Sequence, residues 1–309
     1  FVGCVRCVYE LDLTQILIDK TDYELVIIDR LDFKLNSEFK QKYYDLDRVT
    51  FHQKDIRDLT FMKNILQSND YVVNLAALVG EPLCKIKPEE AVEVNFEAAK
   101  NLAELCKEKN IKKFIQLSTC SNYGQAKEMV DEDGELFPTS LYAETKVNLE
   151  KYLIKNIPNA TTLRCATAYG LSVGRMRFDL LVSDFIKEAW LEKQINVFMP
   201  EVHRPIVHVS DISNAILLCI DHEGTLSRVY NVGSSIQNYT KRQIAEKVAN
   251  RLNVPLNIVE KIDKRDYIVN FDRIKNELNF STKFLAEDGI EEMVKILEDG
   301  NYDLEQSNV

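Results

Sequence analysis

The feature that most constrains this chain is a regular alternation of strand-like and helix-like segments in its first half. Short apolar runs with strand character lie at residues 24–28, 50–53, 71–75, 114–117 and 161–163. Between them lie helix-like segments at residues 11–19, 59–67, 88–109 and 141–155, and in the last two, which are long, apolar residues recur three and four positions apart. Buried strands that alternate with helices predict an α/β fold, a doubly wound parallel sheet covered on both faces. In such sheets ligands bind at the carboxyl ends of the strands.

The regular alternation of strands and helices ends after about Gly170. Helices are predicted at 179–192, 211–222, 241–252 and 285–297, and strands at 196–199 and 228–232. Their spacing is too irregular for a second doubly wound domain. The sequence therefore predicts a main domain over residues 1–170 and a smaller C-terminal α/β lobe over 171–309, with some segments of that lobe returning to the main sheet.

Composition excludes several function classes. The formal net charge is −10, and no basic run interleaves with aromatic residues, so nucleic acid is not an expected partner. No apolar run approaches the roughly 18 residues of a membrane span, and the seven cysteines are scattered, which favours a reducing cytoplasm over a disulfide framework. The four histidines lack metal-ligand spacing, and Cys4-x-x-Cys7 has no second ligand pair nearby, so we expect no metal.

The first chemical signal is the pair Tyr142 and Lys146, four residues apart at the start of a predicted helix. This spacing puts both side chains on one face. A cationic lysine beside a phenol favours the phenolate, so a group with an ordinary pKa near 10 becomes usable as a base near neutral pH. Alone the spacing is weak, because a packed tyrosine and a solvated lysine give the same pattern.

Other markers stand in a fixed order around this pair. The strand over 114–117 ends in Ser118-Thr119-Cys120-Ser121-Asn122-Tyr123-Gly124, which places a hydroxyl in the expected cleft. The remaining markers are Asp29, Asp55-Ile56, Asn74-Leu-Ala-Ala, Asn95, Tyr169-Gly170 and the stretch from Arg204 to Asp211. With these markers the chain resembles, over about residues 24–297, the extended short-chain dehydrogenase/reductase family of NAD-dependent nucleotide-sugar epimerases and dehydratases, whose fold is Rossmann-like.

The resemblance implies a role for each matching residue. Tyr142 is the base that removes the hydroxyl proton, Lys146 binds the nicotinamide ribose and holds the phenolate, and Thr119 hydrogen-bonds the reacting oxygen. It also implies cofactor contacts at Gly3, Asp29, Arg30, Asp55, Ile56, Asn74, Leu75, Ala76, Ala77, Asn95, Ser118 and Tyr169, beside Tyr142 and Lys146. A carboxylate at Asp29 would repel a 2′-phosphate, which favours NAD over NADP, and Arg30 beside it softens that preference.

The resemblance further implies that Arg204 and Arg265 bind the substrate's diphosphate, since two arginines from distant segments would form a local basic pocket. Surface salt bridges are the alternative reading of each arginine alone. The other expected substrate contacts are Thr119, Thr167, Arg175 and Arg177. On this basis residues 1–170 form the NAD-binding domain, and the C-terminal lobe mainly binds substrate.

The glycine-rich turn departs from the family pattern G-x-x-G-x-x-G, which lets bare backbone approach the pyrophosphate. With Gly3 as the first glycine, the next two positions hold Arg6 and Tyr9. Two explanations stay open: the chain begins inside the first strand with part of the motif missing, or the turn is altered and binds the cofactor weakly. Tight retention of NAD by the purified protein would contradict the second.

The reaction is narrowed by the two residues after Thr119. Dehydratases of the family carry Asp-Glu there, whereas this chain has Cys120 and Ser121, which disfavours a 4,6-dehydratase. We expect a 4-epimerase or a 4-dehydrogenase, with a 4-keto-sugar reductase and a non-catalytic dinucleotide-binding relative as alternatives. Residues 76–85, 174–182, 241–243 and 264–269 resemble GDP-heptose 4-dehydrogenases of capsule polysaccharide pathways. Family members pair the helices over 88–109 and 141–155 between subunits, which predicts a homodimer.

Overall fold

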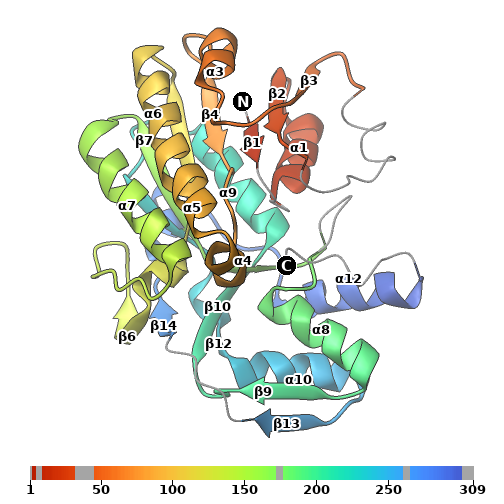
Figure 1. The fold of residues 1–309 in the computed structure, drawn as a ribbon. Coiled ribbons are helices and arrows are strands. Elements are labelled where there is room, and N and C mark those ends of the chain that lie inside the picture. Colours follow the sequence, from red (N-terminus) through yellow and green to blue (C-terminus); the bar gives the residue numbers. More distant parts are fainter. Residues whose placement is uncertain (1, 5–8, 32–44, 172–176, 260–264, 301–309) are drawn as a thin grey trace.

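The computed structural model describes residues 2–4, 9–31, 45–171, 177–259 and 265–300. Its centre is a seven-stranded, wholly parallel sheet with the order β11-β7-β5-β4-β1-β2-β3 (Figure 1). The strands are β1 (Val2–Cys4), β2 (Leu25–Asp29), β3 (Val49–Gln53), β4 (Tyr71–Asn74), β5 (Lys113–Thr119), β7 (Ala160–Cys165) and β11 (Val229–Val232). The predicted fold class is confirmed.

Helices cover both faces of this sheet because successive strand residues point to opposite sides. Ile27 packs into a core with Leu13 and Ile216, whereas its neighbour Ile28 packs into a separate core with Met62 and Leu102. The helices of the first face are α1 (Tyr9–Lys20), α9 (Val209–Asp221) and α11 (Asp272–Leu278). Those of the second are α3 (Leu59–Ile65), α6 (Ala99–Glu108) and α7 (Leu141–Asn156).

The segment predicted as one long helix over 88–109 is interrupted, so that prediction is wrong in detail. It consists of α5 (Pro88–Val92), a π-helical turn η2 (Glu93–Ala98) and α6. The apolar spacing that predicts a helix does not reveal a local change to i→i+5 bonding. Such turns often occur at functional sites, and this one carries Asn95.

The C-terminal part divides between the main sheet and a second core. Strand β11 and helices α9 and α11 join the main sheet, whereas α8 (Leu181–Glu192), α10 (Lys241–Leu252) and α12 (Ala286–Glu298) pack with β9 (Ile195–Phe198) and its partner β13 (Leu256–Val259). This group forms the lower part of Figure 1. Among the described residues, no helix is long and apolar enough to cross a bilayer.

Two short sheets connect these parts. One contains β8 (Thr167–Tyr169), β10 (His203–His208) and β12 (Asn238–Thr240), and the other pairs β6 (Gln125–Val130) with β14 (Asp266–Val269). The sequence did not predict these strands or α4 (Glu81–Ile86), which lies between the main sheet and the lower group (Figure 1). They are short, and β10 contains Pro205, which removes a backbone donor and weakens a strand signal.

Candidate active site

Several predicted site residues stand at the carboxyl ends of neighbouring strands. Asp29 ends β2, Asn74 ends β4 and Thr119 ends β5. Because these strands are parallel and in register, with Asn74 opposite Gln116 and Thr119 opposite Cys165, their ends share one edge of the sheet. This is the edge at which doubly wound sheets bind ligands.

Tyr142 and Lys146 reach the same edge from the first turns of α7. Ser140 caps this helix by accepting a bond from the backbone N–H of Ala143. The Lys146 side chain is buried, and its Nζ donates to the carbonyl of Leu117 at 3.1 Å, two residues before Thr119. The same Nζ lies 6.0 Å from the centroid of the Tyr142 ring. The helix thus holds the phenol and the ammonium beside the end of β5.

Thr119 begins the short 3-10 turn η3 (Cys120–Tyr123). Its Oγ1 accepts a bond from the N–H of Ser121 at 3.1 Å, which fixes the side chain at the strand end. That bond uses an oxygen lone pair and not the hydroxyl proton, so Thr119 can still donate to a reacting oxygen. Ser118, also predicted, is buried, and its Oγ accepts from Asn122 Nδ2 at 3.1 Å.

The π-helical turn connects Asn95 to the end of β4. Asn95 Oδ1 accepts from the N–H of Leu78 at 2.7 Å, and its Nδ2 donates to the Leu78 carbonyl at 3.0 Å. Asn74 is buried and donates to Gln116 Oε1 at 2.8 Å. These bonds hold the buried Leu75-Ala76-Ala77 segment against the sheet edge. Asn95 therefore acts from behind this segment, as a buried polar anchor.

An acidic and basic cluster lies near the end of β2. Arg30 Nη1 donates to Glu90 at 2.8 Å and to Asp55 at 3.2 Å, and Arg57 also donates to Asp55. Burial alone would raise the pKa of Asp55, but the bonds from Arg57 and Arg30 hold this pKa below its ordinary value. Next to it, Ile56 belongs to a small apolar cluster with Ala76 and Leu78, against which the Tyr142 ring packs.

Of the two predicted diphosphate arginines, Arg204 contacts the backbone of Arg265. The guanidinium of Arg204, on β10, donates to the backbone carbonyl of Arg265 at 2.8 Å. It also lies over the ring of Tyr267, 5.4 Å from the centroid. The Tyr267 hydroxyl is 3.3 Å from Ser121 Oγ, so a continuous contact path runs from the arginines to the turn that begins at Thr119.

The remaining predicted residues occupy several positions. The Tyr169 ring is buried in the second core, and its hydroxyl lies 3.2 Å from both Gln237 Oε1 and the carbonyl oxygen of Phe284, either of which can accept its proton, so this side chain lies in the interior rather than at the sheet edge. Arg177 is buried and paired with Asp179 at 2.7 Å. Thr167 lies in β8 opposite Ile206. Gly3 lies in β1 opposite Asn74, at the same carboxyl edge of the sheet, and both Arg6 and Arg175 fall outside the described residues.

Sequence reasoning missed the contact between Ser121 and Tyr267 and the buried residues behind α7, where Glu150 pairs with Arg164. Tyr267 belongs to the stretch that holds Arg265, so the sequence contained a pattern from which its proximity to the site could have been predicted. No sequence pattern predicted the pairing of Glu150 with Arg164, because it depends on how α7 packs on β7. Within the described ranges, no group of three or more His, Cys, Asp or Glu side chains could hold a metal ion.

Comparisons with known proteins identify the family of the chain. The model of a family described as the NAD dependent epimerase/dehydratase family matches residues 12–233. The chain is similar to low-salt glycan biosynthesis protein Agl12 of Haloferax volcanii, with 25% identity over 289 residues, 90% of this chain and 91% of the relative. It is also similar to UDP-glucuronate 4-epimerase of Thermodesulfobacterium geofontis, with 27% identity over 278 residues and 82% of each chain covered.

Solved structures share the fold. The crystal structure of UDP-glucuronic acid 4-epimerase from Bacillus cereus, in complex with UDP-glucuronic acid and NAD, superposes with a TM-score of 0.84 at 22% identity. The match covers 96% of this chain and 99% of that one. A dTDP-glucose 4,6-dehydratase from Streptomyces venezuelae, with NAD and TYD bound, gives a TM-score of 0.83 at 18% identity, covering 96% and 97%.

Proposed function

Since the chain belongs to the NAD dependent epimerase/dehydratase family, we propose that it oxidises a ring hydroxyl of a nucleoside-diphosphate sugar at C4, as a 4-epimerase or a 4-dehydrogenase. The observation that carries this proposal is the position of Lys146. Its ammonium is bonded to the Leu117 carbonyl beside the Tyr142 ring, two residues before Thr119. A base, a cation and a hydroxyl donor thus share one edge of the sheet.

The described residues fit NAD. At the sheet edge a buried carboxylate, Asp29, ends β2, where ribose hydroxyls require an acceptor, and β4 is followed by the small side chains of Ala76 and Ala77. Lys146 would hold the nicotinamide ribose. When bound, NAD accepts a hydride from the carbon that carries the reacting hydroxyl.

Residues of the chain accept the proton of the sugar hydroxyl and position its oxygen. Tyr142 as phenolate accepts the proton of the sugar hydroxyl, and the nearby Lys146 ammonium stabilises the negative charge on the phenol. Thr119 holds the reacting oxygen through a hydrogen bond, since its own rotamer is fixed by Ser121. Arg204 and Arg265 bind the diphosphate and so keep the sugar at the end of β5.

The turn after Thr119 argues against loss of water from the sugar. Cys120 is buried, donates to the carbonyl of Arg164 and has its pKa raised by that burial, so it is a packed neutral thiol. Ser121 is bonded to Tyr267. Neither position offers the carboxyl group that acid–base elimination requires. This favours oxidation, with or without return of the hydride. The GDP-heptose subgroup and the homodimer both stay predictions.

The test is turnover of UDP-, dTDP- and GDP-linked sugars with and without added NAD, followed by mass spectrometry and NMR of the products. An epimerase gives the C4 epimer without net NADH, whereas a dehydrogenase gives a keto-sugar and one NADH for each turnover. A 4-keto-6-deoxy product would contradict the proposal in favour of a dehydratase. A protein that binds a dinucleotide but converts no sugar nucleotide would be a non-catalytic relative.

Arg204→Gln is expected to weaken binding of the substrate nucleotide by about 10- to 100-fold, because a charge-assisted bond to a phosphate contributes roughly 1.5–3 kcal/mol. Titration calorimetry with UDP, dTDP and GDP measures the effect. Arg242→Gln is the matched control, since Arg242 is half-exposed and pairs with Glu201. Equal losses in both variants would remove Arg204 from the diphosphate site.

Asp29→Ser is expected to reduce the preference for NAD over NADP by about 10- to 100-fold, since it removes the carboxylate that binds ribose hydroxyls and repels a 2′-phosphate. Dissociation constants of both dinucleotides, measured by fluorescence quenching, check this. Glu24→Gln, at an exposed position just before the same strand, should leave both constants unchanged. An unaltered ratio in Asp29→Ser would place the ribose elsewhere.

A further inference from the structure

Behind the candidate active site, α7 carries Glu150, a second buried ionisable residue after Lys146. Tyr142, Lys146 and Glu150 follow one another at intervals of four, so they lie on one side of the helix. Lys146 and Glu150 are both almost fully buried, with exposed fractions of 3% and 2%. The helix that presents the base therefore continues inward as a line of ionisable groups.

The partner of Glu150 is Arg164, on β7. Arg164 Nε donates to one carboxylate oxygen at 2.9 Å and Nη2 to the other at 2.5 Å, which is a two-pronged contact of fixed geometry. Arg164 is itself 3% exposed and stands opposite Ser118 in the sheet. The pair thus bonds α7 to the strand that neighbours β5, one residue from the register position of Thr119.

A third nitrogen of Arg164, Nη1, contacts the turn η3. Nη1 donates to the hydroxyl of Tyr123 at 2.7 Å and to the carbonyl of Glu132 at 3.1 Å. Tyr123 closes η3, and Asn231 Oδ1, at 2.7 Å, accepts from its hydroxyl. Arg164 therefore touches both elements that present reacting groups, α7 with Tyr142 and η3 with its cap Thr119.

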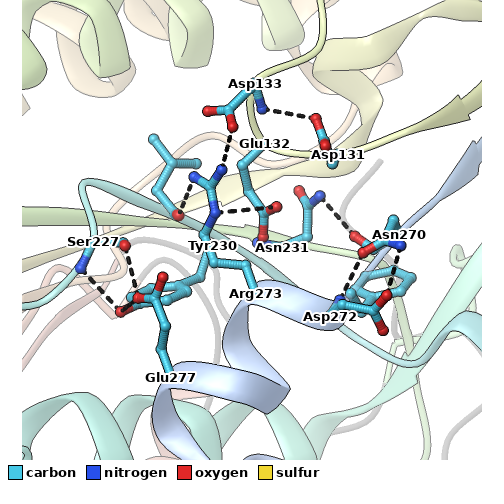
Figure 2. A network of polar contacts seen from close by, with 12 residues as sticks. Asp131, Glu132, Asp133, Ser227, Tyr230, Asn231, Asn270, Asp272, Arg273 and Glu277 are labelled. Carbon is cyan, nitrogen blue, oxygen red and sulfur yellow. Dashed lines mark hydrogen bonds and ion pairs between the residues drawn. The ribbon is translucent and has the colours of Figure 1, made fainter.

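The network ends in the loop after β6 and in α11. Glu132 Oε1 accepts from the N–H of Asn231 at 2.8 Å, while Arg273 contacts Glu132 at 3.6 Å and Asp133 at 2.6 Å. Figure 2 shows this outer end, where Arg273 points from α11 towards the two acids. Its side chain is partly exposed, unlike those of Glu150 and Arg164.

We propose that Glu150 and Arg164 are positioning residues for the reaction at Tyr142: the buried pair fixes α7 against η3 and keeps the interior beside Lys146 electrically neutral. This inference rests on the proposed role of Tyr142. A buried ion pair is weak evidence for stability, since its desolvation offsets much of its attraction. The arrangement here is specific in another respect, because the side-chain bonds of the pair end on α7 and η3, two elements of the candidate site, apart from one bond to the carbonyl of Glu132.

Other titratable groups face this region from the elements around α7. They are Cys84 from α4, Glu104 from α6, Cys120 and Tyr123 from η3, Cys165 from β7 and Glu132 from the loop after β6. Burial raises the pKa of Cys84 to about 11 and raises the pKa of Cys120 and Tyr123, so these three stay neutral near pH 7. Burial also raises the pKa of Glu132.

The test uses the positive charge of Arg164, which has no carboxylate partner at position 150 in the Glu150→Gln variant. Arginine does not lose its proton in proteins, so this variant adds an unbalanced positive charge about 12 Å along the helix from Tyr142. At an effective dielectric constant near 20, the phenol should titrate about half to one pH unit lower. The tyrosinate absorbance of the purified protein, minus that of its Tyr142→Phe counterpart, measures this. The acidic limb of the rate profile should move by the same amount.

Glu150→Gln combined with Arg164→Met restores neutrality and should return the phenol titration to its original midpoint. Arg273→Met, at the outer end of the network, should not move it. A folded Glu150→Gln protein with an unchanged Tyr142 titration would overturn the proposal, as would a double variant with the same shift as the single one. A merely structural pair would lower stability in all these variants without a charge-dependent midpoint.

A second variant covers the case in which Glu150→Gln does not fold. Glu150→Asp keeps the charge but retracts the carboxylate by one methylene, so kcat should fall about 10- to 100-fold while the Tyr142 titration stays unchanged. An unaltered kcat would contradict the positioning role. If the original protein converts no sugar nucleotide, the proposed function is wrong. The absorbance titration of Tyr142 still tests whether Glu150 and Arg164 act on this residue.

Discussion

Tyr142→Phe is expected to lower kcat by about 10²- to 10⁴-fold while dinucleotide and sugar-nucleotide affinities change little. The ring packs against the apolar cluster around Ile56 and Ala76, and phenylalanine keeps that packing. What is lost is the oxygen that accepts the substrate proton. The predicted loss therefore falls on the chemical step and not on folding, and single-turnover measurements with saturating substrate would reveal it.

Tyr152→Phe is a matched control on the same helix. Its hydroxyl donates to Glu104 at 2.5 Å, away from the sheet edge, and Tyr152 lies ten positions after Tyr142. This variant should retain kcat within about twofold, because the bond that it removes does not involve the reacting groups. Retained turnover in Tyr142→Phe, or an equal loss in both variants, would remove Tyr142 from the role of base.

The sequence predicted the parts of the site that depend on local geometry. The spacing of Tyr142 and Lys146 depends only on helical periodicity, and the position of Thr119 depends only on where β5 ends. Six of the seven strands of the main sheet, all but β1, were likewise predicted to within one or two residues, because buried parallel strands are compact apolar runs.

The parts that it did not predict depend on three-dimensional packing. The π-helical turn around Asn95 leaves the apolar pattern of the helix almost unchanged. The pairing of Glu150 with Arg164 is set by the packing of α7 on β7, and a glutamate on an amphipathic helix ordinarily reads as solvated. The short strands around β10 gain their stability from the lobe that they connect and not from their own propensity.

Gly124→Ala is expected to destabilise the protein by about 4 kcal/mol or more, an exceptional loss for a single substitution that here follows from a backbone clash. Gly124 has a φ of +61°, and a Cβ placed there would lie 1.8 Å from the carbonyl oxygen of Phe137. The neighbouring backbone cannot move aside easily, because Phe137 donates to Asn122 at 2.9 Å and Asp266 donates to the Gly124 carbonyl at 3.0 Å. Any relief must displace η3 and therefore Thr119.

Gly300→Ala separates the clash from the strain of the dihedral angle. Gly300 has a similar φ of +68°, but a Cβ there meets nothing within 4 Å. It should cost only about 1 kcal/mol, the ordinary penalty for a left-handed alanine. Denaturant unfolding compares the two, and at roughly 2 °C for each kcal/mol Gly124→Ala should lower Tm by about 8 °C or more. Similar losses of stability in the two variants would mean that the loop at Phe137 moves and relieves the clash. Residual Gly124→Ala protein should also have lost most of its kcat, since the turn that carries Thr119 would no longer stand beside Tyr142.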